Sequence, residues 1–279
     1  MESAGTAPPK PPELPEDARP RWPWWYGPVG FVTGALVGLI SAGIAWAAMG
    51  VDDPSESPAA IIVGTLLLDG SLVAVALVFA SFVRRPRPWH FGLRRTPFWP
   101  AVGWAALGIF SFYVFAAVYT VIVQPDVEQS VAEDLGAGES SIGLIAAGFM
   151  IICVAPLAEE IFFRGFFYGA LRTKFTVAVA ATIDGLVFGM IHFEGGTDGL
   201  LIVPPLAVLG VIFCLVYEQT RSLYPVVALH SLNNAIAYAF QADGGAVSLV
   251  FGPLMIASCA LVPRWTSRAP SPVSPHPVA

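Results

Sequence analysis

The sequence predicts an all-α, polytopic membrane helix bundle with about eight transmembrane helices, and three observations lead to this fold class. First, 56% of the 279 residues are hydrophobic and only 12% are charged, whereas soluble domains carry about 25% charged residues. Second, apolar windows of about 20 residues, the length that crosses the hydrocarbon core, recur along the chain. Third, the connections between these windows are short. The sequence therefore leaves no room for a separate soluble domain.

Eight apolar windows are the expected helices of a transmembrane domain that spans residues 28–263. They cover residues 28–50, 58–83, 98–123, 141–171, 176–193, 199–217, 223–241 and 245–263. Two tails that we expect to be disordered flank this domain, because residues 1–27 are rich in Pro and charge and residues 264–279 are of low complexity. Aromatic residues typical of the headgroup belt precede the first helix: Trp22, Trp24, Trp25 and Tyr26.

The distribution of basic residues predicts the topology. All 14 Lys and Arg residues lie before the first window, in alternate connections, after the last window or, for Arg164, toward the same side within the fourth. The charged residues of the other connections are all acidic. Because cytoplasmic loops collect Lys and Arg, we expect both termini in the cytoplasm and a multi-pass protein of the cell (plasma) membrane. The net charge of −6 and the lack of a basic face indicate the lipid bilayer rather than nucleic acid as a partner.

Three charged residues interrupt the fourth window, which is otherwise apolar from residue 142 to residue 167. Glu160 and Arg164 are spaced i,i+4 with the acid first, the favourable order for an ion pair on one helix face. Glu159 is left without that partner and is a candidate general base. Charge at this depth is costly and indicates a functional site. A buried structural ion pair with a spare acid is the alternative.

Two further polar pairs lie in the fifth and seventh windows. Phe188 and His192 share one helix face, as do His230 and Asn234, because each pair is spaced i,i+4. At about 1.5 Å per residue, both pairs reach the depth of Glu159. A single histidine on an apolar face is more often a hydrogen-bonded core residue. The whole polar set at one depth predicts a shared site instead, since each unpaired polar group is costly in hydrocarbon.

These three motifs, Glu159-Glu160-x-x-x-Arg164, Phe188-x-x-x-His192 and His230-x-x-x-Asn234, resemble the motif set of the CPBP family in order and separation. This family of intramembrane proteases includes the type II CAAX prenyl endopeptidases (Rce1-like) and the bacterial Abi proteins. The resemblance covers a protease-like core at residues 141–241. It implies an endopeptidase that hydrolyses a membrane-associated or lipidated peptide or protein.

The resemblance also implies roles for the motif residues. Glu159 and His192 would activate a water, and His230 with Asn234 would stabilise the oxyanion. Glu160 and Arg164 would hold the first glutamate in place, which agrees with what peptide hydrolysis requires.

Several alternatives stay open at this stage. Zinc held by His192, His230 and a carboxylate would make the protein a metalloprotease, although an HExxH motif is absent; the other option is a glutamate-activated water without a cofactor. The protein is alternatively a non-catalytic membrane scaffold of the same family, or a proton- or ion-coupled transporter.

Two acids lie outside the motifs. Asp184 is expected to be a partner for His192 or a neutral core acid, and Asp69 to make a polar contact between helices or to line the site.

Overall fold

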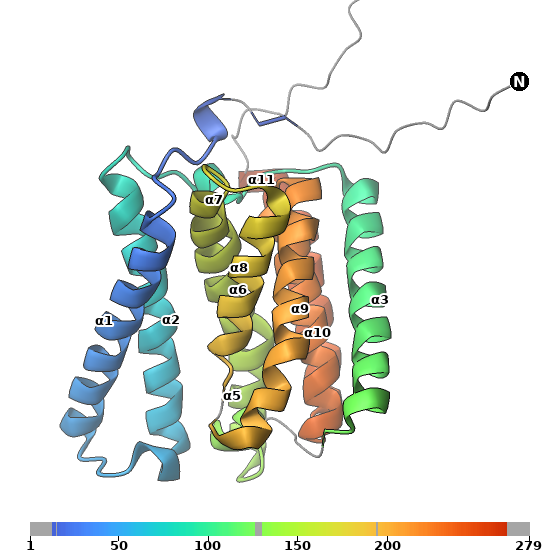
Figure 1. Cartoon of the computed structure of the whole chain (residues 1–279). Coiled ribbons are helices and arrows are strands. Elements are labelled where there is room, and N and C mark those ends of the chain that lie inside the picture. Colours follow the sequence, from blue (N-terminus) through green and yellow to red (C-terminus); the bar gives the residue numbers. More distant parts are fainter. Residues whose placement is uncertain (1–12, 15, 126–129, 194, 267–279) are drawn as a thin grey trace, which may run out of the picture.

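The computed structural model describes residues 13, 14, 16–125, 130–193 and 195–266, and within them every regular element is helical. The main helices stand side by side as a bundle (Figure 1). They are α1 (Tyr26–Met49), α2 (Pro58–Ser81), α3 (Phe98–Val123), a composite fourth helix (Ser141–Leu171), α8 (Val177–Met190), α9 (Gly196–Thr220), α10 (Leu223–Gln241) and α11 (Gly245–Thr266). Short elements lie in the connections: η1 (Glu16–Ala18), η2 (Pro54–Glu56), η3 (Pro88–Phe91) and α4 (Val131–Asp134).

All eight expected windows are helical, but they do not all qualify as membrane spans. Among the described residues, 6 helices are long and apolar enough to cross a membrane, and α8 is apolar but shorter, with 14 residues. The α10 helix is not one of the 6, because His230, Ser231, Asn233 and Asn234 interrupt its apolar run. Its polar side chains are largely buried inside the bundle. The protein is therefore a multi-pass membrane protein by helix composition, and the expected eight spans are confirmed for 6 helices.

The basic connections gather at one end of the bundle, which we call the Arg-rich end (Figure 1). Arg94 and Arg95, which precede α3, bond to backbone carbonyls at Arg221 and Pro263. These contacts bring the start of α3, the start of α10 and the end of α11 together. This is the alternation that the positions of Lys and Arg predict. The orientation of the Arg-rich end toward the cytoplasm stays a prediction.

The segment before α1 packs on the bundle. The Trp22 ring is completely buried, stacks on Phe91 with ring centroids 5.3 Å apart, and donates a hydrogen bond to the Phe166 carbonyl at 3.2 Å. Trp24 and Trp25 remain partly exposed. Trp22 thus differs from the expectation of a disordered tail over residues 1–27. Residues 1–12 and 15 of that tail, and residues 267–279 of the other, lie outside the described residues.

Small residues let α8 and α9 approach closely, and this approach positions the site. A Cβ atom at Gly185 would lie 2.5 Å from the Ala207 carbonyl oxygen, and one at Gly189 would lie 2.7 Å from that of Val203. Such spacing of small residues is typical of tightly packed membrane helices. The close packing brings the α9 backbone to the centre of the bundle, where the charged residues of the fourth helix lie.

Candidate active site

The fourth helix changes its hydrogen-bond register on both sides of the glutamates. It runs as α5 (Ser141–Phe149), the π-helical segment η4 (Met150–Val154), α6 (Ala155–Glu160), a second π-helical segment η5 (Ile161–Phe167) and α7 (Tyr168–Leu171). Single π-helical turns inside α-helices are frequent at functional sites. Pro156 contributes to the first register change, because it lacks the amide hydrogen of a regular helix. The glutamates therefore lie on one short α-helical stretch between two widened turns.

Arg164 is the centre of a fully buried charge cluster. Its guanidinium donates to Glu160 Oε1 at 2.8 Å and to the Gly210 carbonyl at 3.1 Å, and its Nε lies 3.5 Å from Asp184 Oδ1. Aromatic rings of Phe163, Phe188 and Phe213 surround the guanidinium at 4.5 to 5.6 Å. The predicted Glu160–Arg164 pair is therefore present. Asp184 belongs to this cluster, where it also accepts from the Cys214 thiol at 3.1 Å, and no contact with His192 is seen among the described residues.

His230 joins this cluster to the other glutamate. Its Nδ1 lies 2.9 Å from Glu160 Oε1, so Nδ1 carries the hydrogen of this bond, because a carboxylate only accepts. The opposite ring nitrogen, Nε2, lies 3.9 Å from Glu159 Oε2. The Phe213 ring covers the imidazole, with centroids 4.9 Å apart. Glu160 is buried and accepts hydrogen bonds from both Arg164 and His230. It thus fixes the Nδ1 side of the imidazole and points Nε2 at Glu159.

Glu159 differs from Glu160 in exposure and in partners, because Glu160 is fully buried and its Oε1 accepts from both Arg164 and His230, although its Oε2 also lacks a described partner. The Glu159 side chain is 13% exposed, and within the described residues its Oε2 has no hydrogen-bond partner. Asp69, buried on the neighbouring helix α2, is close enough for its charge to interact with that of Glu159. The unpaired Oδ2 of Asp69 favours the interpretation that this acid belongs to the site. Glu160 therefore holds the scaffold together, and Glu159 is the carboxylate that is available for chemistry.

His192 lies just beyond the end of α8 and is half-buried. Its Nδ1 is 2.8 Å from the Phe188 carbonyl, which fixes the hydrogen on Nδ1 and leaves Nε2 as the free nitrogen. The Phe188 ring lies between the two imidazoles, with centroids 4.9 Å from His192 and 5.8 Å from His230. Phe188 therefore packs both histidines against one surface, as the shared-site prediction requires.

Asn234 contacts the widened turn of the fourth helix. Its Nδ2 donates to the Ile151 carbonyl at 2.9 Å. In the i→i−5 register that Ala155 adopts toward Met150, the missing Pro156 amide would have bonded to Ile151. The proline thus leaves a carbonyl that the asparagine satisfies. One Nδ2 hydrogen is used in this way, and an amide nitrogen has a second.

The zinc alternative finds no suitable ligand set. No group of three or more His, Cys, Asp or Glu side chains among the described residues is placed to hold a metal ion. His230 also has its Nδ1 committed to Glu160 and its ring covered by Phe213. The residues present do not fit a three-ligand zinc site, and the metalloprotease alternative is not supported.

Comparison with known proteins places this geometry in a family. Residues 141–236, which contain all seven motif residues, match the type II CAAX prenyl endopeptidase Rce1-like family. This part of the chain belongs to the Rce1-like family. The predicted CPBP membership is therefore confirmed, and the chain is a relative of membrane CAAX proteases.

Two curated proteins are similar to part of the chain. The membrane-embedded CAAX protease MroQ of Staphylococcus aureus (strain USA300) is 30% identical over 99 residues, which are 33% of this chain and 38% of the relative. The putative membrane peptidase YdiL of Bacillus subtilis (strain 168) is 28% identical over 90 residues, 32% and 35% of the two chains. The similarity thus spans little more than a third of either relative. No solved structure matches the chain.

Sequence reasoning missed two parts of the Rce1-like site. Phe213 and Gly210 lie in an apolar run of α9 and carry no charge that would single them out, although Phe213 covers His230 and Gly210 binds Arg164. The small residues Gly185 and Gly189, spaced four apart, were the available signal, because they predict close packing of α8 against a partner helix.

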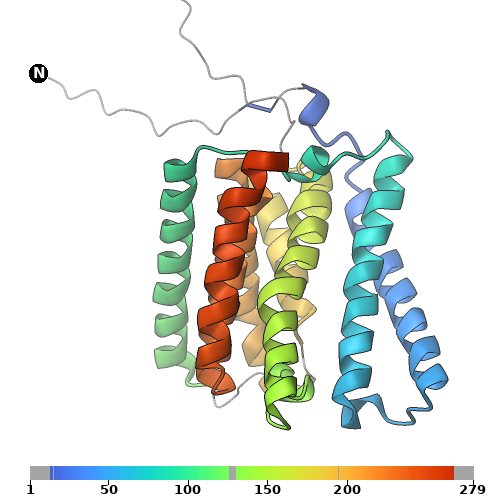
Figure 2. The same cartoon turned by 180° about the vertical axis from the view of Figure 1, so that it is seen from behind.

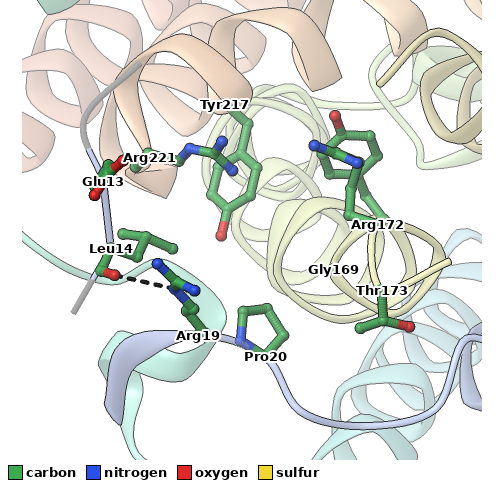
Figure 3. A pocket seen from close by; sticks show the side chains of 10 residues that line it. Glu13, Leu14, Arg19, Pro20, Gly169, Arg172, Thr173, Tyr217 and Arg221 are labelled. Atoms are coloured by element: carbon green, nitrogen blue, oxygen red, sulfur yellow. Dashed lines mark hydrogen bonds between the residues drawn. The ribbon is translucent and has the colours of Figure 1, made fainter. Parts of the chain in front are cut away.

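A second arginine–glutamate cluster, the outer cluster, lies at the Arg-rich end. Glu218 accepts from Arg172, from Arg221 and from the Tyr168 hydroxyl, at distances between 2.5 and 3.3 Å. Arg172 and Arg221 also face a pocket of about 510 Å³, together with Arg19 from the segment before α1 (Figure 3). Every polar group of Glu218 is paired, so this cluster has no free base.

Proposed function

We propose that this protein is an intramembrane endopeptidase that hydrolyses a peptide bond in a membrane-associated or lipidated substrate. The observation that carries the proposal is the placement of the unpaired Glu159 Oε2 beside His230 Nε2, with Glu160 fixing the far side of the imidazole. Two acceptors facing each other at 3.9 Å can bind one water between them. A water held by a carboxylate and an oriented imidazole is the arrangement that general-base hydrolysis requires.

In the proposed reaction, the water oxygen attacks the scissile carbonyl carbon while Glu159 takes one of its protons. The negative charge that forms on the carbonyl oxygen is stabilised by donors at the site, for which the second Nδ2 hydrogen of Asn234 and a protonated His192 Nε2 are the candidates. Collapse of the tetrahedral intermediate breaks the C–N bond, and the proton held by Glu159 passes to the leaving amine. The products are a new carboxylate and a new amine, and no cofactor is consumed.

This assignment changes one expected role. The family resemblance pairs His192 with Glu159 and gives His230 to the oxyanion. Both histidines have Nδ1 bonded to an acceptor and present a lone pair at Nε2 when neutral, but among the described residues only the Nε2 of His230 lies near Glu159, at 3.9 Å. We therefore pair His230 with Glu159 and place His192, whose Nε2 has no carboxylate within ion-pair distance among the described residues, on the oxyanion side.

The substrates we propose are peptides or proteins that lie in the plasma membrane. The names of the family and of one relative describe CAAX proteases, so a lipidated C-terminal peptide is one candidate class. A transmembrane peptide without a lipid is the other, because the site lies among membrane helices. The alternation of Lys and Arg supports an orientation with both termini in the cytoplasm, and we propose the plasma membrane as the location.

The test is cleavage by the purified protein in liposomes that contain a mixed library of prenylated and non-lipidated membrane peptides. We expect wild type to cleave at least one class and Glu159→Gln to cleave none, because the amide cannot accept a proton. Glu139→Gln, the same change at an exposed acid outside the site, is the matched control and should cleave as wild type does. Cleavage by Glu159→Gln at the wild-type rate would reject the mechanism. Absence of cleavage by wild type, with cellular function retained in His192→Ala and His230→Ala, would favour a scaffold.

A further inference from the structure

The structure contains a large apolar groove that the proposed catalytic site does not use. It has a volume of about 1000 Å³ and is lined by residues of α3, α10 and α11; α3 and α11 stand next to each other in Figure 2. Most of the residues that line it are Ala, Ile, Leu, Val or Pro, and its volume is at the upper end of small-molecule sites, roughly 300–1,000 Å³. We propose that this groove binds one acyl chain of an anionic phospholipid, whose phosphate lies at the arginines of the groove mouth.

The mouth of the groove is positive and has no described counter-charge. Arg94, Arg95 and Arg264 line it, no Asp or Glu does, and none of the three arginines forms a salt bridge with a described carboxylate. Arg95 donates instead to the carbonyls of Pro263 and Arg264. Basic pockets between helices at this depth are typical lipid headgroup sites. A lipid phosphate would therefore supply the negative charge that the described residues at the mouth lack.

Arg94 shows this lack of a negatively charged partner most clearly. Its side chain is buried, and its described hydrogen-bond partners are the neutral Arg221 and Trp89 carbonyls and the Tyr217 hydroxyl. Burial is the main cause that lowers the pKa of Arg94 below its ordinary value. A nearby phosphate would offset this cost of desolvation.

The length of the groove fits a single leaflet of the membrane. Along α3 the walls run from Phe98 to Ile109, and along α11 from Pro253 to Arg264. Eleven residues of helix correspond to about 17 Å, and one leaflet of hydrocarbon is about 15 Å thick, half of about 30 Å. The arginines lie at the end of these helices where the headgroup layer begins. A lipid with its chain in the groove thus places its phosphate at the mouth.

A lipid in this groove would also contact the helix that carries the active site. Leu229 and Leu232 of α10 line the groove and flank His230, whose imidazole faces the other way toward Glu160. Binding would therefore support the position of His230 from behind. The proposal does not depend on the proposed protease activity, because its measurement is binding.

The experiment is native mass spectrometry of the purified full chain with equal amounts of phosphatidylglycerol and phosphatidylcholine of the same chain length. We expect preferential retention of phosphatidylglycerol. Arg264→Gln should weaken it about fivefold, the effect of one arginine at a lipid surface. Arg85→Gln, the matched control, removes an exposed arginine of the connection between α2 and α3 that does not line the groove, and should bind as wild type does. Equal retention of both lipids, or equal loss in Arg85→Gln, would overturn the proposal.

A second pair of variants tests the chain rather than the headgroup. Ala106→Phe fills the groove from α3, and we expect it to remove the preference for phosphatidylglycerol. Ala117→Phe adds the same bulk at an exposed position of α3 outside the groove and should leave it unchanged. Unchanged binding of phosphatidylglycerol in Ala106→Phe would contradict the proposal, because it would show a headgroup site without a bound chain. Displacement of phosphatidylglycerol by millimolar inorganic phosphate would contradict it too, because it would show a site for the free anion.

Discussion

The outer cluster and the inner cluster of Glu160, Arg164 and Asp184 both pair arginine with acids, and only the inner one holds an imidazole that faces a second carboxylate among the described residues. In the outer cluster, Glu218 is shared by Arg172 and Arg221, whose side chains are 27% and 23% exposed. In the inner cluster, Glu160 and Arg164 have no exposure at all, and Glu160 shares its oxygen with His230. Next to them lies Glu159, with an oxygen that lacks a described partner. A buried ion pair alone therefore does not mark a site, whereas an oriented imidazole facing a spare carboxylate does.

The two clusters are also expected to differ in how much their ion pairs contribute to the stability of the fold. The two arginines of the outer cluster are partly exposed although Glu218 is buried, so water screens these ion pairs more than those of the inner cluster and each should contribute less. The inner cluster is surrounded by aromatic rings, and removal of one partner leaves a buried charge without compensation. Variants of the two clusters should therefore fail in different ways.

After the loss of cleavage in Glu159→Gln, the largest expected effect on catalysis is at His230. We expect His230→Gln to lower kcat by about 10²–10⁴-fold, because the general base Glu159 then lacks the imidazole that holds the water for proton transfer. His192→Gln should lower kcat less, because Glu159 and His230 still hold the water. Cleavage assays at equal folded concentration measure both. A larger loss in His192→Gln would restore the role assignment that the family resemblance implies.

The largest effect on stability is expected at Arg164. Arg164→Met leaves Glu160 and Asp184 buried without their shared cation, and should cost about 3–5 kcal/mol. Unfolding in mixed micelles of mild and denaturing detergent measures this cost. Arg172→Met in the outer cluster is the matched comparison. Equal losses for the two variants would mean that burial does not distinguish the clusters.

A smaller effect is expected where Asn234 meets the fourth helix. Asn234→Leu leaves the Ile151 carbonyl unsatisfied and should cost about 1–3 kcal/mol. Pro156→Ala supplies an amide hydrogen that can replace Asn234 as the donor to Ile151. We therefore expect Asn234→Leu to cost less in a Pro156→Ala background, as measured by a double-mutant cycle of unfolding free energies. Additive costs would show that the proline and the asparagine are independent.

The smallest effect is expected at the partly exposed arginine of the outer cluster. Arg221→Gln should change the free energy of unfolding by no more than about 1 kcal/mol and leave cleavage unchanged, because Arg172 and Tyr168 still satisfy Glu218. The same detergent unfolding and cleavage assays measure it. A loss of activity here would extend the site to the Arg-rich end.

The helices and the motif residues could be predicted because their signals are local. Apolar length and the i,i+4 spacing place Glu160 beside Arg164 and locate each helix to within a few residues. The family match covers residues 141–236, the range that contains the motif residues. What local signals could not supply is the partner of Asp184, which is Arg164 on another helix, because that contact depends on how closely α8 and α9 pack.

Two other features depend on long-range packing. Trp22 follows a polar, Pro-rich stretch, and its burial against Phe166 becomes evident only when α1 and the fourth helix meet. Two of the eight expected spans are not among the 6 candidate spans of the described residues, because α8 is short and α10 carries polar residues that it buries within the bundle. The orientation of the termini and the roles of the site residues stay predictions.

The most direct test compares the two adjacent glutamates in one preparation, measuring both cleavage and unfolding for Glu159→Gln and Glu160→Gln. We predict that Glu159→Gln unfolds as wild type does and is inactive. Glu160→Gln should be markedly less stable, because it weakens the bonds to both Arg164 and His230. We thus assign the stabilisation of the structure to Glu160 and the chemistry to Glu159. Activity retained in Glu159→Gln, or a loss of stability in Glu159→Gln as large as that in Glu160→Gln, would contradict this assignment.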